Sequence, residues 1–202
     1  MTLHMIHAAS SINDEGWLCG ARCIASPNFD ARPPTAEITL LVIHNISLPP
    51  AEYGGPGVQQ LFTNQLNAAE HPYYAAIAHL RVSAHFFIRR DGELIQFVSC
   101  RDRAWHAGVS HWRGQDKCND FSIGVELEGS DDTAFTEAQY AQLTVLLAAL
   151  RLAYPTLTDI AGHADIAPGR KTDPGPHFDW ERISFIPHPS TPHPSNLSTP
   201  IL

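Results

Sequence analysis

Ile38-Thr-Leu-Leu-Val-Ile-His-Asn45 is the stretch around which the fold is built. Its apolar and β-branched residues have the composition of a buried strand, and Pro49-Pro50 must end that strand. The run closes on His44 and Asn45. A histidine at the end of a buried strand is either a hydrogen-bonded core residue or a metal ligand on a rigid base, and this stretch leaves both interpretations open.

The neighbouring segments predict further strands and helices. Arg81–Arg89 and Glu93–Val98 flank Asp91-Gly92, a strong hairpin signal because both turn residues tolerate positive φ. Phe121–Gly129 and Asp159–His163 are also typical of strands. We expect a short helix over Val58–Leu66, a loop around Tyr73 and Tyr74, a longer helix that a Thr136/Gln139 capping box opens and Pro155 stops, and a helical turn from Phe178 to Ile183.

These elements predict a single α/β domain over residues 1–186. Residues 1–36 carry several Pro breakers and no strand or helix pattern, so we expect an irregular but ordered N-terminal arm. Residues 187–202 are rich in Pro, Ser, Thr and His and predict a mobile C-terminal tail.

Composition narrows the range of partners. The chain has 202 residues and a formal net charge of -8, which argues against nucleic acid because phosphate binding needs a basic surface. The start of the chain lacks a basic flank followed by an apolar run, and no apolar stretch is long enough to span a membrane. We therefore expect a cytoplasmic protein whose four cysteines are thiols. We also expect a monomer.

The segment from His163 to Pro176 concentrates reactive side chains in a stiff loop. It holds a histidine, two aspartates, an arginine and a lysine among three prolines and two glycines. Imidazole and carboxylate are usual zinc ligands, so His163 and Asp173 are proposed ligands, with Lys171 free to point into the same site. The alternative is an ordinary Pro/Gly connection whose charges face water.

Two other motifs carry polar groups that need an explanation. Glu126 and Glu128 share one face of the strand predicted over Phe121–Gly129. Such glutamates are costly unless they are exposed, paired or functional, so Glu126 is either a solvated edge residue or a general base. The adjacent Trp105 and His106 could stack on a sugar and order a site, or belong to the core.

Taken together, these residues fit a hydrolytic zinc centre. Two strand-end histidines and an acidic third ligand would hold zinc, which acidifies water to a pKa of about 7. Glu126 would take the proton and deliver it to a leaving amine. Lys171 would meet the charge that grows on the carbonyl oxygen.

Four motifs resemble those of the zinc N-acetylmuramoyl-L-alanine amidases, and among them the cytoplasmic AmpD type. They are Leu-Val-Ile-His-Asn, Ala-Trp-His-Ala-Gly, Cys-Asn-Asp-Phe-Ser-Ile-Gly-Val-Glu-Leu-Glu-Gly and Gly-His-Ala-Asp-Ile-Ala-Pro-Gly-Arg-Lys-Thr-Asp-Pro-Gly-Pro. The likeness runs from about Gly16 to Trp180. It implies a mixed central β-sheet flanked by helices, with zinc ligands His44, His163 and Asp173, catalytic acid/base Glu126 and intermediate-stabilising cation Lys171.

The resemblance also implies a reaction and a substrate. The bond is the amide between N-acetylmuramic acid, in its 1,6-anhydro form, and L-alanine of muropeptides returned during peptidoglycan recycling. We expect Arg81 and Lys117 to clamp the peptide carboxylates, and Asn45 and Trp105 to contact peptide and sugar. Two alternatives remain, namely a non-catalytic muropeptide-binding module on the same fold and a zinc peptidase that cuts inside the stem peptide.

Overall fold

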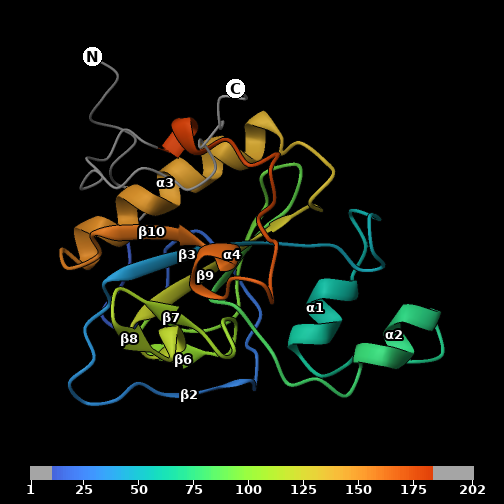
Figure 1. Cartoon of the computed structure of the whole chain (residues 1–202), viewed down its shortest axis with the longest axis horizontal. Helices are drawn as coiled ribbons and strands as arrows, with labels where there is room; N and C mark the ends of the chain where they lie inside the picture. The colour runs from blue at the N-terminus through green and yellow to red at the C-terminus, as the bar shows by residue number, and fades with distance from the viewer. Residues whose placement is uncertain (1–10, 184–202) are drawn as a thin grey trace, which may run out of the picture.

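A six-stranded mixed sheet forms the centre of the molecule (Figure 1). The structure, a computed structural model, describes residues 11–183, so the predicted domain end at 186 and the predicted tail lie outside the described residues. The strand order is β1-β5-β4-β9-β3-β10. Their bounds are β1 Arg22–Cys23, β3 Leu40–Ile46, β4 Phe86–Ile88, β5 Leu94–Gln96, β9 Ser122–Glu128 and β10 Asp159–Gly162.

Parallel pairing dominates this sheet. β10, β3, β9 and β4 run parallel to one another, and β1 is parallel to β5. The antiparallel pair is β4 with β5, joined through Asp91-Gly92 with Gly92 at φ 90°. The hairpin and the mixed sheet predicted from the sequence are therefore confirmed.

One long helix covers one face of the sheet. α3 (Glu137–Ala153) begins at Thr136, whose hydroxyl accepts from the Gln139 N–H at 3.2 Å as the capping box predicts. Figure 1 shows the helix lying along one side of the sheet. Its buried leucines pack with Ile123, Val125 and Leu127 of β9, and the closing turn η2 (Trp180–Ile183) contacts the helix.

Short elements and loops cover the opposite face. Helices α1 (Gly57–Phe62) and α2 (Pro72–Ile77) form one part, and Leu61, Phe62 and Tyr74 pack there with Phe87 and Ile95 of the sheet. The remaining elements are β2 (Phe29–Ala31) paired with β6 (Asp102–Ala104), β7 (His111–Trp112) paired with β8 (Gln115–Asp116), η1 (Cys118–Asp120) and α4 (His163–Ile166).

Three sequence expectations are wrong in detail. The helix predicted over Val58–Leu66 ends at Phe62. α2 lies where a loop was expected, because the His71 side chain accepts from the Tyr73 N–H and Pro72 occupies the first turn. The N-terminal arm is not free of strands, since β1 extends the main sheet and β2 pairs with β6.

Within residues 11–183, no helix has both the length and the apolar character needed to cross a bilayer.

Candidate active site

The register of the two central strands sets His44 beside Glu126. β3 and β9 are parallel, and these two residues are direct partners. Partners in a parallel pair point to the same face, so both side chains emerge on the face opposite α3. His44 is 1% exposed and Glu126 is 8% exposed. The interpretation of Glu126 as a solvated edge residue is therefore wrong, because β9 is central and the glutamate is buried.

Glu128, two residues further along, has a structural role. It is buried, and its carboxylate accepts from the Gly54 N–H at 2.6 Å and the Arg90 N–H at 3.1 Å. These bonds join two loops to the end of β9. The two glutamates of one strand face thus differ, since Glu128 is fully engaged with backbone groups.

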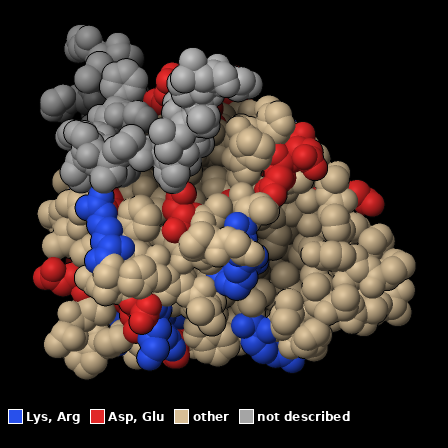
Figure 2. All heavy atoms as spheres, viewed as in Figure 1, with Lys and Arg blue, Asp and Glu red and all other residues tan. Residues whose placement is uncertain are grey.

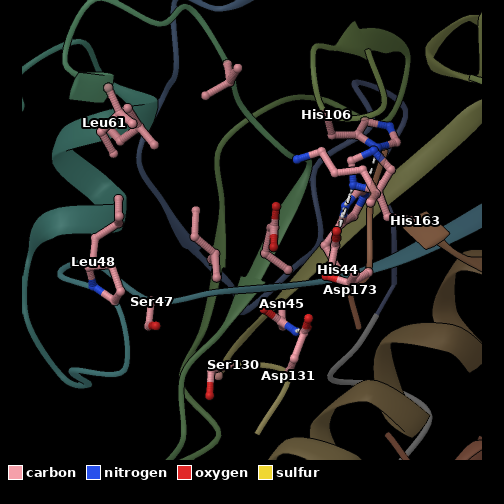
Figure 3. A pocket seen from close by; sticks show the side chains of 18 of the residues that line it. His44, Asn45, Ser47, Leu48, Leu61, His106, Ser130, Asp131, His163 and Asp173 are labelled. Atoms are coloured by element: carbon pink, nitrogen blue, oxygen red, sulfur yellow. Dashed lines mark hydrogen bonds and ion pairs between the residues drawn. The ribbon is translucent and has the colours of Figure 1, made fainter. Parts of the chain in front are cut away.

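Three side chains from separate parts of the chain converge on one point (Figure 3). The Nδ1 atoms of His44 and His163 are 3.0 Å apart, and each lies 3.0 Å from Oδ2 of Asp173. His44 comes from β3, His163 begins α4 directly after β10, and Asp173 lies in the following loop. Because β10 pairs with β3, the two histidine-bearing segments are neighbours at the same edge.

The chemistry of this donor set calls for a cation. Nε2 of His163 lies 3.1 Å from the carbonyl oxygen of Ala107, which can only accept, and 3.4 Å from the Arg170 guanidinium, which can only donate. The shorter contact assigns the ring proton to Nε2 and a lone pair to Nδ1. That lone pair faces the Asp173 carboxylate. A tetrahedral zinc site with ordinary bond lengths holds neighbouring ligand atoms roughly 3.3 Å apart, close to the spacing seen here. The three residues therefore fit a zinc ion.

Burial sets the ionisation of these groups. Burial lowers the pKa of His44 to about 4, so its imidazole is neutral at pH 7, as a metal ligand must be. Burial works to raise the pKa of Asp173, yet beside the two imidazoles that pKa stays below its ordinary value, so Asp173 is a carboxylate.

Glu126 differs from its neighbours in having an unpartnered oxygen. Its Oε2 atom is buried and has no hydrogen-bond partner within the described residues. Burial, and secondly the charge of Asp173, raise the pKa of Glu126 well above its ordinary value. A carboxyl group whose pKa is raised holds a proton more readily than an ordinary glutamate does, which suits a group that takes a proton and then gives it up.

A cavity of about 710 Å³ lies over these residues. His44, Glu126, His163, Lys171 and Asp173 line one side of it. Figure 3 shows Leu48 and Leu61 across the cavity from the His/His/Asp cluster. In Figure 2 the face is hollowed beside α1 and α2, and its Lys and Arg side chains stand in small groups. The apolar wall consists of Leu48, Leu61, Phe62, Ile77, Leu80 and Val82.

The predicted substrate residues divide into two pairs. Asn45 and Trp105 line the cavity. The amide nitrogen of Asn45 donates to Asp131 at 2.7 Å and to the Pro174 carbonyl at 3.1 Å, which leaves its carbonyl oxygen for a ligand. The indole N–H of Trp105 donates to Asp30 at 3.1 Å, so the arm orients this ring.

Arg81 and Lys117 do not line this cavity. The guanidinium of Arg81 donates to the carbonyls of Ala78, His79 and Leu80 just after α2. Lys117 sits at φ 61° before η1 and is exposed. The expectation that Arg81 and Lys117 clamp the peptide carboxylates in this cavity is therefore wrong for the structure as it stands.

Three further residues lie around the cavity; of these, only His106 was considered in the sequence analysis, either as part of a site or as a core residue. His106 contacts His44, with its Nδ1 atom 2.9 Å from Nε2 of that ring. Arg170 donates to the carbonyls of Ala107 and Val109 and so ties the late loop to residues 107–109. The Asp131 carboxylate accepts the hydrogen bond from the Asn45 amide nitrogen. The adjacent Trp105-His106 motif was the available signal for His106.

Two imidazole nitrogens and a carboxylate oxygen converge beside a buried carboxyl group that has an unpartnered oxygen. This arrangement defines a class of protein, the metal-dependent hydrolases. Comparison with known proteins then identifies the family. Residues 34–176 match the family model described as N-acetylmuramoyl-L-alanine amidase. The chain belongs to this amidase family, which confirms the resemblance drawn from its motifs.

Individual relatives agree with this assignment. The chain is 56% identical over 179 residues to the 1,6-anhydro-N-acetylmuramyl-L-alanine amidase AmpD of Citrobacter freundii, covering 88% of this chain and 96% of that protein. A crystal structure of a selenomethionine AmpD derivative superposes with a TM-score of 0.82 at 57% identity, covering 84% and 96%. Escherichia coli AmiD in complex with the substrate anhydro-N-acetylmuramic acid-L-Ala-D-γ-Glu-L-Lys gives 0.55 at 27% identity, covering 85% and 63%.

Proposed function

We propose that this protein is a zinc amidase that cleaves the amide between 1,6-anhydro-N-acetylmuramic acid and L-alanine in muropeptides, as its AmpD relatives are named for doing. One observation carries the proposal beyond family membership. Two imidazole nitrogens and a carboxylate oxygen lie 3.0 Å from one another beside Glu126, whose buried Oε2 has no hydrogen-bond partner within the described residues. This arrangement is unfavourable without a cation and is productive with one.

His44, His163 and Asp173 would hold the zinc ion. When bound, zinc supplies Lewis-acid chemistry, because it polarises the amide carbonyl and acidifies water. Three protein ligands would be the pattern of catalytic rather than structural zinc, because such a site keeps room for water or substrate. Both histidines are deeply buried, so their rings have little freedom to turn away from the ion they would hold.

Glu126 serves as the general base and then as the general acid. Its carboxylate takes a proton from the attacking water and passes it to the leaving nitrogen of L-alanine, so that the C–N bond breaks without expelling an amide anion. The ammonium group of Lys171, which lines the same cavity, meets the negative charge on the carbonyl oxygen of the tetrahedral intermediate.

The cavity suits a muropeptide of this kind. Its apolar wall can cover the sugar ring and the stem methyl groups, and Asn45 offers a carbonyl oxygen that can accept from a peptide N–H. Trp105 offers a ring whose face can pack on the sugar. We propose a monomer acting in the cytoplasm, where recycled anhydromuropeptides would meet it.

Mass spectrometry of products tests this function directly. Zinc-loaded protein incubated with purified anhydromuramyl tripeptide should release anhydro-N-acetylmuramic acid and the intact peptide. A chelator should stop the reaction and zinc should restore it. Cleavage inside the peptide would favour the stem-peptidase alternative, and binding without cleavage would favour the non-catalytic module.

A further inference from the structure

His106 stands behind His44 and contacts the ring nitrogen of His44 that faces away from the metal-binding cluster. Its ring lies edge-on to that of His44, with centroids 5.1 Å apart and an interplanar angle of 89°. Nδ1 of His106 is 2.9 Å from Nε2 of His44, the nitrogen that faces away from the cluster. Either ring could be the donor in this bond, so the direction has to come from what His106 contacts on its other side.

Ser122 settles the direction at that other side. Its hydroxyl oxygen lies 2.5 Å from the Cys118 carbonyl oxygen and 3.2 Å from Nε2 of His106. The carbonyl can only accept, so the hydroxyl hydrogen of Ser122 goes to Cys118. Ser122 is fully buried, so no exchange with bulk solvent competes for this hydrogen. The oxygen of Ser122 then has only lone pairs to offer, and Nε2 of His106 must be the donor.

A neutral imidazole carries one ring proton, so the proton position on His106 determines the proton position on His44. Because Nε2 of His106 carries the proton, its Nδ1 is an acceptor. Nε2 of His44 must therefore donate to it, and Nδ1 of His44 is left with a lone pair. That lone pair is the one that lies 3.0 Å from Nδ1 of His163 and from Oδ2 of Asp173.

The packing around His106 leaves the ring little freedom to turn. A Cβ atom at Gly124 would lie 2.5 Å from Cγ of His106, so the ring rests directly on the β9 backbone. The N–H groups of His106 and Ala107 both donate to the side-chain oxygen of Asn119, at 3.2 and 2.8 Å. The loop and the ring are thus fixed independently of any metal.

We propose that His106, oriented by Ser122 and the Cys118 carbonyl, is a positioning residue that locks His44 in the Nε2–H tautomer and so presents its Nδ1 to zinc. The inference rests on the proposed zinc site. It gives the two histidine ligands different supports. His163 is fixed by a backbone carbonyl, whereas His44 is fixed by a relay of two side chains that single substitutions can break.

Long-range ¹H–¹⁵N NMR of the zinc-loaded protein tests the tautomers without an activity assay. His106 should show the Nε2–H form, and His44 should show Nε2–H with a coordinated Nδ1. Loss of the His106 signals in a His106→Asn variant assigns them. A His106 ring protonated on Nδ1, or a His44 ring coordinated through Nε2, would overturn the proposal.

Zinc affinity, measured by competition with a chromophoric chelator, tests the consequence. Ser122→Ala and His106→Leu should each weaken zinc binding roughly 10- to 100-fold, the usual effect of removing an outer hydrogen-bond partner of a ligand. His106→Asn, whose side-chain oxygen can accept in place of Nδ1, should bind zinc more tightly than His106→Leu. Ser26→Ala removes another buried serine hydroxyl, one that donates to the Phe62 carbonyl oxygen and contacts none of the proposed zinc ligands, and should leave the zinc affinity unchanged.

The outcomes separate this inference from the amidase proposal. Equal affinities in all four variants, or equal losses in Ser122→Ala and Ser26→Ala, would refute the relay. Correct tautomers and the expected affinity order in a protein that fails to cleave anhydromuropeptide would instead refute the function and leave the relay standing. A protein that binds no zinc would overturn both.

Discussion

A single methyl group placed at Gly124 should disturb the metal site from the strand beneath it. In a Gly124→Ala variant the new Cβ would lie 2.5 Å from Cγ and 2.6 Å from Nδ1 of His106. Carbon atoms in contact normally stay about 3.5 Å apart or more, so the ring must move by roughly 1 Å. The 2.9 Å bond from His44 would then lengthen, to roughly 3.9 Å if the ring moves directly away, which is beyond hydrogen-bonding range.

The energetic cost follows from this displacement. Overpacking a tight site costs about 1–3 kcal/mol, and each of the two hydrogen bonds of His106 contributes about 0.5–1.5 kcal/mol. We therefore expect Gly124→Ala to lower the free energy of unfolding of the zinc-free protein by about 2–6 kcal/mol. Zinc affinity should fall roughly 10- to 100-fold because His44 loses its partner.

Urea unfolding of zinc-free protein and chelator competition measure the two effects. Gly55→Ala is the matched control, because its Cβ would meet nothing closer than the Leu48 carbonyl oxygen at 3.7 Å. Both variants change the unfolded chain in the same way, so their difference isolates the native clash. Gly124→Ala with stability and zinc affinity equal to those of Gly55→Ala would refute the argument from packing.

Further predictions concern the reactive groups and the frame that holds them. Glu126→Gln should keep its zinc but lower kcat roughly 10²- to 10⁴-fold, whereas the exposed control Glu181→Gln should keep both its zinc and its kcat. Full activity in Glu126→Gln would show that Glu126 is not the general base. Because burial raises the pKa of Glu126, the zinc-free wild-type protein binds more protons when folded than when unfolded. Its stability should therefore fall as the pH rises from the ordinary pKa of glutamate through the raised pKa of Glu126. Glu126→Gln should gain stability relative to the wild-type protein over that range, as urea titrations at several pH values would show. Asp173→Ala should weaken zinc binding more than either relay variant does, and unchanged chelator competition would exclude it as a ligand. Thr136→Ala should cost about 0.5–2 kcal/mol of stability through the lost α3 cap with kcat/KM unchanged, whereas Thr136→Ser should retain most of the cap.

Local signals in the sequence predicted much of the frame. The α3 cap depends on residues three apart, and the β4–β5 hairpin on an adjacent Asp-Gly pair, so both could be identified without tertiary information. α2 was missed although His71-Pro72 is a helix-start signal, because the segment lacks a clear apolar period. α4 is only four residues long, which is too short for any periodic pattern.

The site shows where sequence reasoning reaches its limit. The proposed zinc residues could be chosen because they lie in motifs that resemble those of a known family. The structure does place His44, His163 and Asp173 at one point. Arg81 was misjudged because charge alone does not give direction, and its guanidinium turns back onto nearby carbonyl groups at the end of α2. The His106–Ser122 relay depends on hydrogen-bond directions, which exist only once the backbone is folded.

The pairing of His44 with Glu126 across the two central strands has a consequence for how such an enzyme can change. Both groups stand on buried central strands of the sheet, whereas the opposite wall comes from residues 48–82, a segment that adds no strand to the sheet. Replacement of that wall would therefore alter which molecules can enter the cavity while leaving His44 and Glu126 where they are.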